Sequence, residues 1–500
     1  MTDAGATRDA QRLSSDRLPH TLAFVALVAF AGMLECVKLS SLRDPEIWGH
    51  LRAGTWMLQN KTWPQSGLFS QSGALSWQDF SWLFDAAAAM AYRFAGLRAL
   101  PALLLVFRFS LAIIVFLLAG GWRKFWAAAG LSAVVQVLLL SIGPTSAFVS
   151  VILFGVELLV LLEVRDGAGQ RILWTLPALF FLWANLDIGF VYGIALYLVF
   201  LIVLFLEKLP SERISAWIET PSGNLPLRIA LLAGGACVIA SLLNPYLFHP
   251  YISFFNSEFN ALNHNLPGYN AMSFRQPQDY ALMLLAMAAY FALGLLRSSD
   301  LFQIGTLLGC TALAFHAQRE GWLLALVSAA VIGHAVLRNT VTSEQLVPAR
   351  WNSKRLALSG AGLALIFLFF FARVPKDQNV LLAKVAAVFP VRAADFLRHH
   401  PQPSPFFNVY KWGGFLTWYL PEYPVAMDSR RGLYPEVTEL NYFKAMNAEI
   451  PYRDFPPMNR ARTFLMDKAG VMGEALRGVN GFQVIYEDEI SIVYSHELKE

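Results

Sequence analysis

Blocks of apolar residues, each roughly 16–22 residues long and almost free of charge, recur along most of this 500-residue chain. A helix needs about 20 such residues to cross a hydrocarbon core of about 30 Å, where water cannot satisfy the backbone amides. Only 15% of the residues are charged, against about 25% in soluble domains. The pattern therefore predicts a polytopic bundle of about eleven or twelve membrane-spanning helices, at about 21–40, 100–119, 127–142, 147–163, 172–186, 188–206, 229–247, 281–296, 301–316, 321–337 and 356–373, with 80–97 as a twelfth candidate.

Basic residues alternate from loop to loop, which orients these spans. Cytoplasmic loops of membrane proteins are enriched in Lys and Arg. The basic loops, together with the N-terminal arm 1–20, are therefore expected in the cytoplasm, and the loops 41–79 and 249–280 and the segment 374–500 outside. This alternation requires eleven spans, with 80–97 not fully crossing. The basic positions are Arg123, Lys124, Arg165, Arg171, Lys208, Arg213, Arg228, Arg297, Arg338, Arg350, Lys354 and Arg355.

From about residue 374 the composition becomes that of a soluble domain. Short apolar runs predict strands at 405–409, 423–428, 482–487 and 490–495, the last two as a hairpin. Helical patterns run near 381–399, 411–420 and 458–477. Residues 374–500 are therefore expected to form a small extracytoplasmic α/β domain after the membrane domain 21–373.

The first outer loop, 41–79, contains an amphipathic stretch from Ile47 to Gln59 and several tryptophans. Ile47, Trp48 and Leu51 share one helical face. Because tryptophan prefers the headgroup level of a bilayer, we expect this loop to lie along the membrane surface.

The sequence Asp44-Pro45-Glu46 directly follows the first predicted span. Asp44 followed by Pro45 is a common start signal of a helix, so the acid is expected to cap the helix that follows. Two carboxylates at a membrane surface also suit a general base or a hard divalent cation such as Mg²⁺ or Mn²⁺. His50 and Arg52 follow on the same helix as candidates to bind an anionic substrate group. His50 could instead tune Asp44, or be an ordinary, partly exposed surface histidine.

Other polar residues interrupt apolar segments on the outer side. Asn185 and Asp187 lie in WANLDIGF, where a carboxylate is costly unless it faces water or a partner. Arg319 suits bidentate phosphate binding, although an ion pair with Glu320 is the simpler interpretation. Arg275 is the only basic residue of the loop 249–280.

In the C-terminal domain, Lys411-Trp412-Gly413-Gly414 opens a predicted helix, where backbone amides could approach an anion. Asp428 and Arg430 follow a predicted strand, a common position for ligand contacts. The alternative is that both segments serve folding and docking onto the membrane domain.

The sequence excludes several classes of protein. The net charge of +4 gives no reason to expect a nucleic-acid partner. Cys36, Cys237 and Cys310 lie within apolar blocks, without the spacing of a metal site or a disulfide framework. Walker A, G-x-S-x-G and H-E-x-x-H motifs are absent from the sequence.

Five segments occur here in an order that resembles bacterial membrane proteins of the GT-C glycosyltransferase superfamily, the clan of protein mannosyltransferases and aminoarabinose transferases. They are DPEIWGHLRAG, SWQDFSWLFD, WANLDIGFVYG, LLNPY and NVYKWGGFLTWYL with VAMDSRRGLY. The resemblance implies a transferase in the bacterial inner membrane that takes a sugar from a polyprenyl-phosphate donor at the outer face. It implies that the first-loop acid Asp44 is catalytic, with Glu46 as a second catalytic acid or a second metal ligand.

The sequence departs from this family at two places. Where the second segment usually carries a His-Glu pair, this chain has Phe80 and Ser81, with Asp79 just upstream as an expected substrate-binding residue. The WANL segment is usually followed by histidine, and here by Asp187. A changed substrate, a non-catalytic envelope scaffold and a lipid or solute transporter remain as alternatives.

Overall fold

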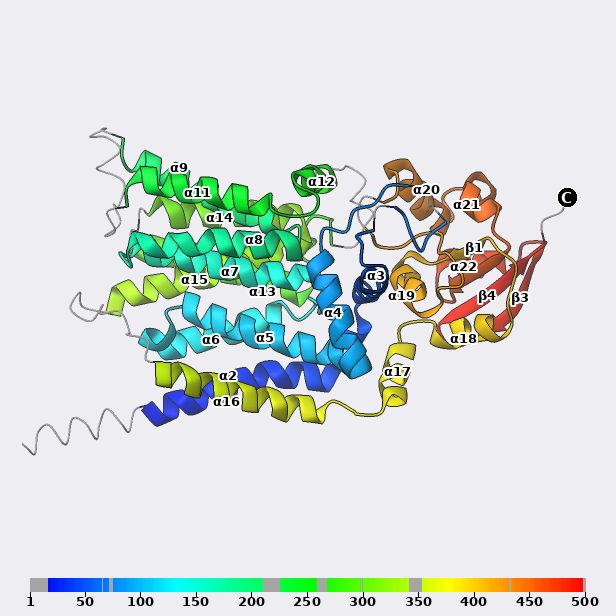
Figure 1. The fold of residues 1–500 in the computed structure, drawn as a ribbon, viewed down its shortest axis with the longest axis horizontal. Helices are drawn as coiled ribbons and strands as arrows, with labels where there is room; N and C mark the ends of the chain where they lie inside the picture. The colour runs from blue at the N-terminus through cyan, green and yellow to red at the C-terminus, as the bar shows by residue number, and fades with distance from the viewer. Residues whose placement is uncertain are drawn as a thin grey trace, which may run out of the picture.

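The computed structural model describes residues 17–64, 66–71, 75–209, 225–258, 268–296, 298, 300–340, 353–430 and 433–497. Most of the predicted N-terminal arm and the basic positions Arg213, Arg297 and Arg350 lie outside these described residues. The chain forms an elongated molecule, with a helical bundle at one end and a small sheet-containing domain at the other (Figure 1).

A helix occurs at each of the eleven predicted spans, so the predicted fold class is confirmed. The helices run back and forth along the bundle, and the N-terminal end of α2 lies at the end opposite the C-terminal domain (Figure 1). They are α2 (Arg17–Lys38), α5 (Ala99–Leu118), α6 (Phe125–Leu138), α7 (Ser146–Arg165), α8 (Leu176–Leu186), α9 (Phe190–Leu206), α11 (Leu227–Ser241), α13 (Pro277–Leu296), α14 (Leu301–His316), α15 (Gly321–Thr340) and α16 (Ser353–Arg373).

The helices differ in length. Within the described residues, five stretches are long and apolar enough to cross a membrane, and a bent pair of α16 with α17 (Gln378–Ala386) would make a sixth. Helices α9, α11 and α14 have only 17, 15 and 16 residues. At about 1.5 Å per residue they fall a little short of a hydrocarbon core of about 30 Å. The five stretches are His20–Val37, Trp82–Leu118, Ser146–Arg165, Pro277–Leu296 and Gln318–Val336.

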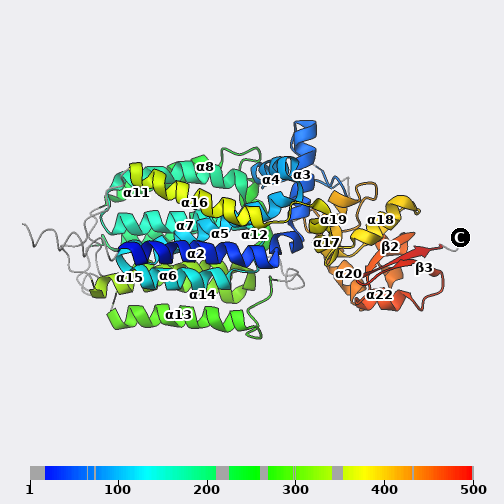
Figure 2. The ribbon, with the colours of Figure 1, turned by 90° about the horizontal axis from the view of Figure 1, so that it is seen from below.

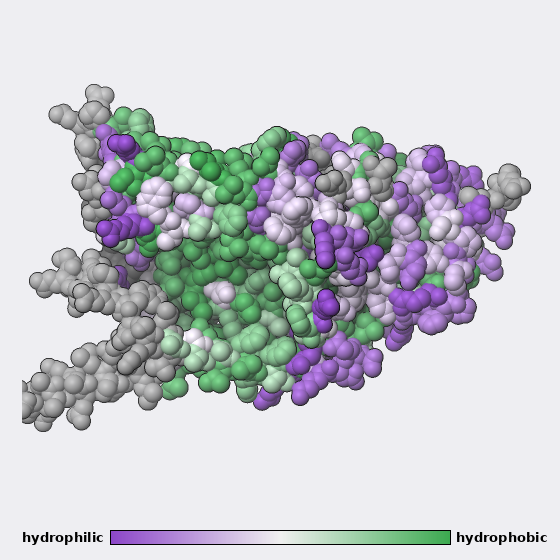
Figure 3. Space-filling view, viewed as in Figure 1, coloured by the Kyte–Doolittle hydropathy of each residue, from purple (hydrophilic) through white to green (hydrophobic). Residues whose placement is uncertain are grey.

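The surface of the bundle is apolar and that of the C-terminal domain is polar (Figure 3). Large apolar side chains on the bundle are more than half exposed, which is expected of a surface that faces lipid rather than water. Examples are Leu231, Leu232, Ile239, Leu284, Phe291, Leu295 and Leu365.

The first outer loop forms a helix pair, α3 (Ile47–Asn60) and α4 (Trp82–Ala95), at the junction of bundle and C-terminal domain. A Cβ atom on Gly54 would lie 1.9 Å from the backbone oxygen of Asp85, so only glycine permits this close approach. Helix α4 lies across the end of the bundle (Figure 1) and leads through η2 (Gly96–Arg98) into α5. This arrangement agrees with the prediction that 80–97 does not fully cross.

The apolar face of α3 is covered by protein, and the position of the first outer loop along the membrane surface stays a prediction. Trp48 is fully buried and contacts the rings of Phe389, Phe415 and Trp418. These partners belong to the C-terminal domain, so the face is covered by protein. The helical periodicity was correct, but it gives no information on whether lipid or protein covers the apolar side.

The C-terminal domain has a four-stranded sheet in the order β1-β2-β4-β3. Strand β1 (Phe406–Asn408) is parallel to β2 (Thr463–Asp467), and β4 (Ser491–His496) is antiparallel to β2 and β3 (Phe482–Glu487). Figure 2 shows the helices of this domain packed around the sheet. They are α18 (Val391–His399), α19 (Tyr410–Tyr419), α20 (Glu436–Met446), α21 (Pro456–Asn459) and α22 (Val471–Leu476).

Three local predictions in this domain are corrected. Residues 463–467, expected to be helical, form β2, because a strand buried on both faces lacks the alternation that identifies strands. Residues 423–428 form only one bridge, Val425 with Ser70 of the first loop. The predicted helix 381–399 is two helices separated at Pro390, which cannot donate a backbone hydrogen bond.

Candidate functional site

A cavity of about 730 Å³ lies where the bundle meets the C-terminal domain. Its wall is built from segments far apart in the sequence: the first outer loop, the starts of α4, α7 and α13, the break between α8 and α9, residues 318–322, and Ser429 with Arg430. Of the predicted site residues, those that line it are Asp44, Glu46, His50, Asp79, Asp187, Arg319 and Arg430.

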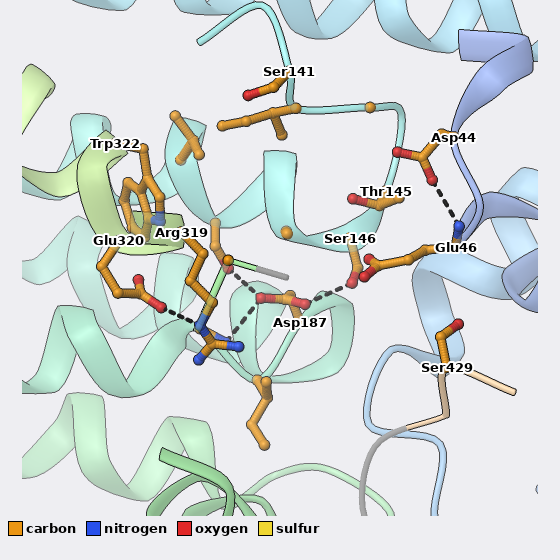
Figure 4. Close-up of a pocket in the computed structure, with 18 of the residues that line it drawn as sticks. Asp44, Glu46, Ser141, Thr145, Ser146, Asp187, Arg319, Glu320, Trp322 and Ser429 are labelled. Atoms are coloured by element: carbon orange, nitrogen blue, oxygen red, sulfur yellow. Dashed lines mark hydrogen bonds and ion pairs between the residues drawn. The ribbon is translucent and has the colours of Figure 1, made fainter. Parts of the chain in front are cut away.

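Asp44 occupies a fixed position on this wall. Its Oδ1 accepts hydrogen bonds from the backbone amides of Glu46 at 2.8 Å and Ile47 at 3.1 Å, so it caps the start of α3 as predicted. A Cβ atom on Gly143 would lie 1.9 Å from its Oδ2, so the loop before α7 packs directly on the carboxylate. Figure 4 shows the second oxygen directed away from the cap.

The environment of Asp44 suits a general base. Burial and the neighbouring Glu46 raise the pKa of Asp44 to about 6, although the two amide hydrogen bonds and His50 oppose this shift. A base whose pKa lies near the working pH is both ionised and able to accept a proton. Capping and a catalytic role are therefore compatible at this position.

Glu46 is exposed and also faces the cavity. The described residues contain no group of three or more His, Cys, Asp or Glu side chains that could hold a metal ion. Asp44 and Glu46 would therefore supply two ligands at most. This suits an ion of the magnesium type, which keeps several waters and binds through one or two carboxylates and substrate phosphates, and not an all-protein cage.

His50 is linked to a second acid. Its Nδ1 lies 2.6 Å from Oδ1 of Asp85, which is almost fully buried on α4. Although burial favours the neutral ring, Asp85 and more distant Asp79 raise the pKa of His50 to about 9. Burial and Asp85 raise the pKa of Asp79 well above its usual range. The cavity therefore has a charged imidazolium beside Asp44.

Asp187 holds the helix break together. Its carboxylate accepts hydrogen bonds from the hydroxyls of Ser146 at 2.6 Å and Ser150 at 2.5 Å, and from the backbone amide of Gly189 at 2.9 Å. Ser150 also accepts a hydrogen bond from Nε1 of Trp183 at 2.7 Å. These three hydrogen bonds fix the position of the carboxylate. This acid joins α7 to the α8–α9 break while lining the cavity.

Two arginines enter from other walls. Arg319 forms an ion pair with Glu320 at 2.7 Å, and its guanidinium lies 3.8 Å from the ring centroid of Tyr269. In Figure 4 its guanidinium points toward Asp187. Arg430 reaches the cavity from the C-terminal domain, over the ring of Trp77 at 5.0 Å. Both cations are held in place before any ligand binds.

Four predicted site residues do not line the cavity. Arg52 lies over the ring of Phe69 at 4.6 Å. Asn185 is structural, since its Oδ1 accepts from Nε1 of Trp82 at 3.0 Å and its amide donates to two backbone carbonyls. Arg275 is exposed. Asp428 is buried behind Arg430, which it binds through both oxygens at 3.0 and 2.9 Å.

The glycine pair of the C-terminal domain serves packing, which favours the docking alternative over anion binding. A Cβ atom on Gly413 would lie 2.3 Å from the backbone oxygen of Met427, and one on Gly414 would lie 2.9 Å from that of Pro45. Gly414 thus brings α19 against the start of α3, directly beside Asp44.

Several lining residues were not singled out from the sequence. Asp85 and Asp279 are each almost fully buried, and Oδ1 of Asp279 accepts a hydrogen bond from Nε2 of Gln318 at 3.1 Å. Each acid lies in the first turn of a long apolar helical segment. A carboxylate in such a segment is costly unless it has a role, and this was the available signal.

Part of the lining of the cavity is apolar. It includes Val137, Leu138, Ile142, Met272 and Leu282. Val137, near the end of α6, is 44% exposed. The lining therefore combines charged residues around Asp44 with apolar residues, a combination suited to a charged head group on a lipid chain.

No protein-family model matches the chain, and no curated protein matches it. Among solved structures, the chain is similar to ArnT from Cupriavidus metallidurans in its crystal structure bound to undecaprenyl phosphate. The two share 14% sequence identity with a TM-score of 0.49, over 94% of this chain and 97% of that chain.

Proposed function

We propose that this chain is a membrane glycosyltransferase of the GT-C type, which moves a sugar from a polyprenyl-phosphate donor to a hydroxyl of a lipid, glycan or protein acceptor. The observation that carries the proposal is the position of Asp44, on the wall of a cavity that is charged on one side and apolar on the other. The head group of the donor would lie beside Asp44, and its prenyl chain would leave past Val137 and Leu138.

The reaction is an inverting displacement. The acceptor oxygen attacks the anomeric carbon, forming a new C–O bond while the bond from that carbon to the phosphate oxygen breaks. Oδ2 of Asp44 takes the acceptor proton as the bond forms. Polyprenyl phosphate leaves with the electron pair, and its negative charge is stabilised by cations already in place, His50, Arg319 and Arg430.

A divalent cation enters this proposal only together with the substrate. Asp44 and Glu46 would hold Mg²⁺ or Mn²⁺ with the donor phosphate and waters as the other ligands, and the ion would neutralise phosphate charge. Transfer measured before and after chelation, and after each metal is restored, tests whether it is needed.

The C-terminal domain closes the site on the side away from the bundle. The backbone amide of Gln71 donates a hydrogen bond to the backbone oxygen of Val425 at 2.9 Å, and the guanidinium of Arg430 donates to the backbone oxygen of Leu68. We place this domain and the cavity at the outer face of the bacterial inner membrane, because the basic loops are at the opposite end.

The test is Asp44→Asn in purified protein supplied with polyprenyl-phosphate hexoses and pentoses. The amide oxygen of Asn still caps α3, so the fold is retained while the base is lost. We expect transfer to fall by about 10²- to 10⁴-fold. Asp377→Asn is the matched control, because Asp377 also accepts a backbone hydrogen bond at a helix start, of α17, and does not line the cavity.

Unchanged transfer by Asp44→Asn would remove this carboxylate from the reaction. If the wild-type chain binds polyprenyl phosphate but transfers none of the sugars, the non-catalytic alternative is favoured.

A further inference from the structure

The pair formed by His50 and Asp85 has a geometry that neither capping nor core packing explains. His50 belongs to α3 and lines the cavity, with 18% of its side chain exposed, whereas the side chain of Asp85 on α4 is 2% exposed. The buried acid therefore holds the inner nitrogen of the ring, Nδ1, at 2.6 Å. The other nitrogen, Nε2, remains as the donor available to a ligand.

The surrounding residues fix the orientation of this ring. Phe84, next to Asp85, meets the imidazole edge to face with 5.2 Å between centroids. The close approach of α3 and α4 at Gly54 sets the separation of the two backbones. A ring held by a hydrogen bond and by an aromatic contact is preorganised, so binding a ligand costs little further ordering.

We infer that Asp85 is a positioning residue that holds His50 through Nδ1, so that Nε2–H of His50 binds the phosphate of the donor and stabilises it as it leaves. This inference rests on the proposed function and assigns the phosphate subsite within the same cavity. It concerns a residue, Asp85, that the mechanism above does not use.

The charges around His50 support this assignment. Asp85 faces the ring from α4, Asp79 from the loop before α4, and Glu46 and Asp44 from the start of α3. Asp85, Asp79 and Glu46 raise the pKa of His50 to about 9 despite its burial. The imidazolium is thus the main form at pH 7–8, whereas an ordinary histidine, with a pKa of about 6.5, would be mostly neutral.

A charged donor matters because the leaving phosphate gains negative charge. A hydrogen bond from a cation to an anionic oxygen is shorter and stronger than one between neutral groups. A neutral imidazole whose Nδ1 is held by Asp85 would still carry one proton, but not the charge that the phosphate requires.

The experiment compares the pH profiles of the wild type and Asp85→Asn from pH 6 to pH 10. Two readouts are used, sugar transfer and the binding of sugar-free polyprenyl phosphate. The Asn side chain keeps an oxygen that accepts from Nδ1–H but loses the charge. We expect the wild type to lose both activities near pH 9, and the variant to lose them about two pH units lower, close to the range of an ordinary histidine. At pH 8 the variant should bind polyprenyl phosphate at least about tenfold more weakly, and near pH 6 the two proteins should converge.

His50→Gln provides an independent arm if Asp85→Asn folds poorly. Glutamine does not titrate, so binding should be weak and should show no alkaline loss near pH 9. Asp377→Asn should follow the wild type throughout. Profiles of Asp85→Asn that superimpose on the wild type would overturn the inference while leaving the proposed function intact. If the wild type neither binds polyprenyl phosphate nor transfers a sugar, the proposed function itself fails.

Discussion

Gly143 should be as important for transfer as a residue that touches the substrate, although it has no side chain. In the structure a Cβ atom at this position would lie 1.9 Å from Oδ2 and 2.5 Å from Cγ of Asp44. Real Cβ atoms are not found closer than 3.0 Å to such neighbours. In Gly143→Ala the carboxylate or the loop must therefore move by about 1 Å, a displacement that can cost about 10²-fold in rate.

A loss of about 10²-fold corresponds to about 2.7 kcal/mol of transition-state stabilisation. The assay is the initial rate of sugar transfer at saturating donor, alongside the thermal unfolding midpoint of the same preparation. Gly130→Ala on α6 is the matched control, because its Cβ would meet no atom within 4 Å. Alanine there should leave the rate unchanged and slightly favour the helix. If the Gly143→Ala protein folds and its initial rate of sugar transfer stays within about threefold of the wild-type rate, the position of the Asp44 carboxylate does not limit the reaction, and the reasoning is refuted.

Two further predictions concern titration and stability. Because burial and Glu46 raise the pKa of Asp44 to about 6, its base form is lost as the pH falls through this value. Initial rates should therefore rise from pH 5 to a plateau at about pH 7–8, below the alkaline loss expected from His50, and a flat profile between pH 5 and pH 7 would argue against Asp44 as the base. Glu157 on α7 is fully buried, and neither of its carboxylate oxygens has a hydrogen-bond partner among the described residues. Glu157→Leu should therefore raise the stability in detergent by about 1–3 kcal/mol, seen as a higher unfolding midpoint, whereas a lower midpoint would indicate that the acid has a partner.

The helical bundle could be predicted from the sequence because its determinants are local. An uninterrupted apolar block must form a helix in a bilayer, since no other arrangement satisfies its backbone within one segment. The eleven predicted helices are therefore all present, from α2 to α16. The start of α3 was also predictable, because Asp44 and Pro45 act on the amides next to them.

The C-terminal domain was harder to predict because burial there is decided by distant partners. Strand β2 is buried on both faces, by neighbours that its own residues do not specify. In the same way, the partners of Trp48 on α3 lie more than 300 positions further along the chain. Local periodicity identifies an apolar face but not what covers it.

The sequence by itself determined that this chain is a helical membrane protein with polar segments gathered at one end, because hydropathy and loop charge act segment by segment. Only the tertiary structure decided which of those polar residues share a cavity. Asp44, Asp187, Arg319 and Arg430 line one cavity, together with Gly143, which packs on Asp44. Arg52, Asn185, Arg275 and Asp428 lie outside it. The physical reason is that contacts between helices depend on how whole surfaces pack, and no single segment carries that information.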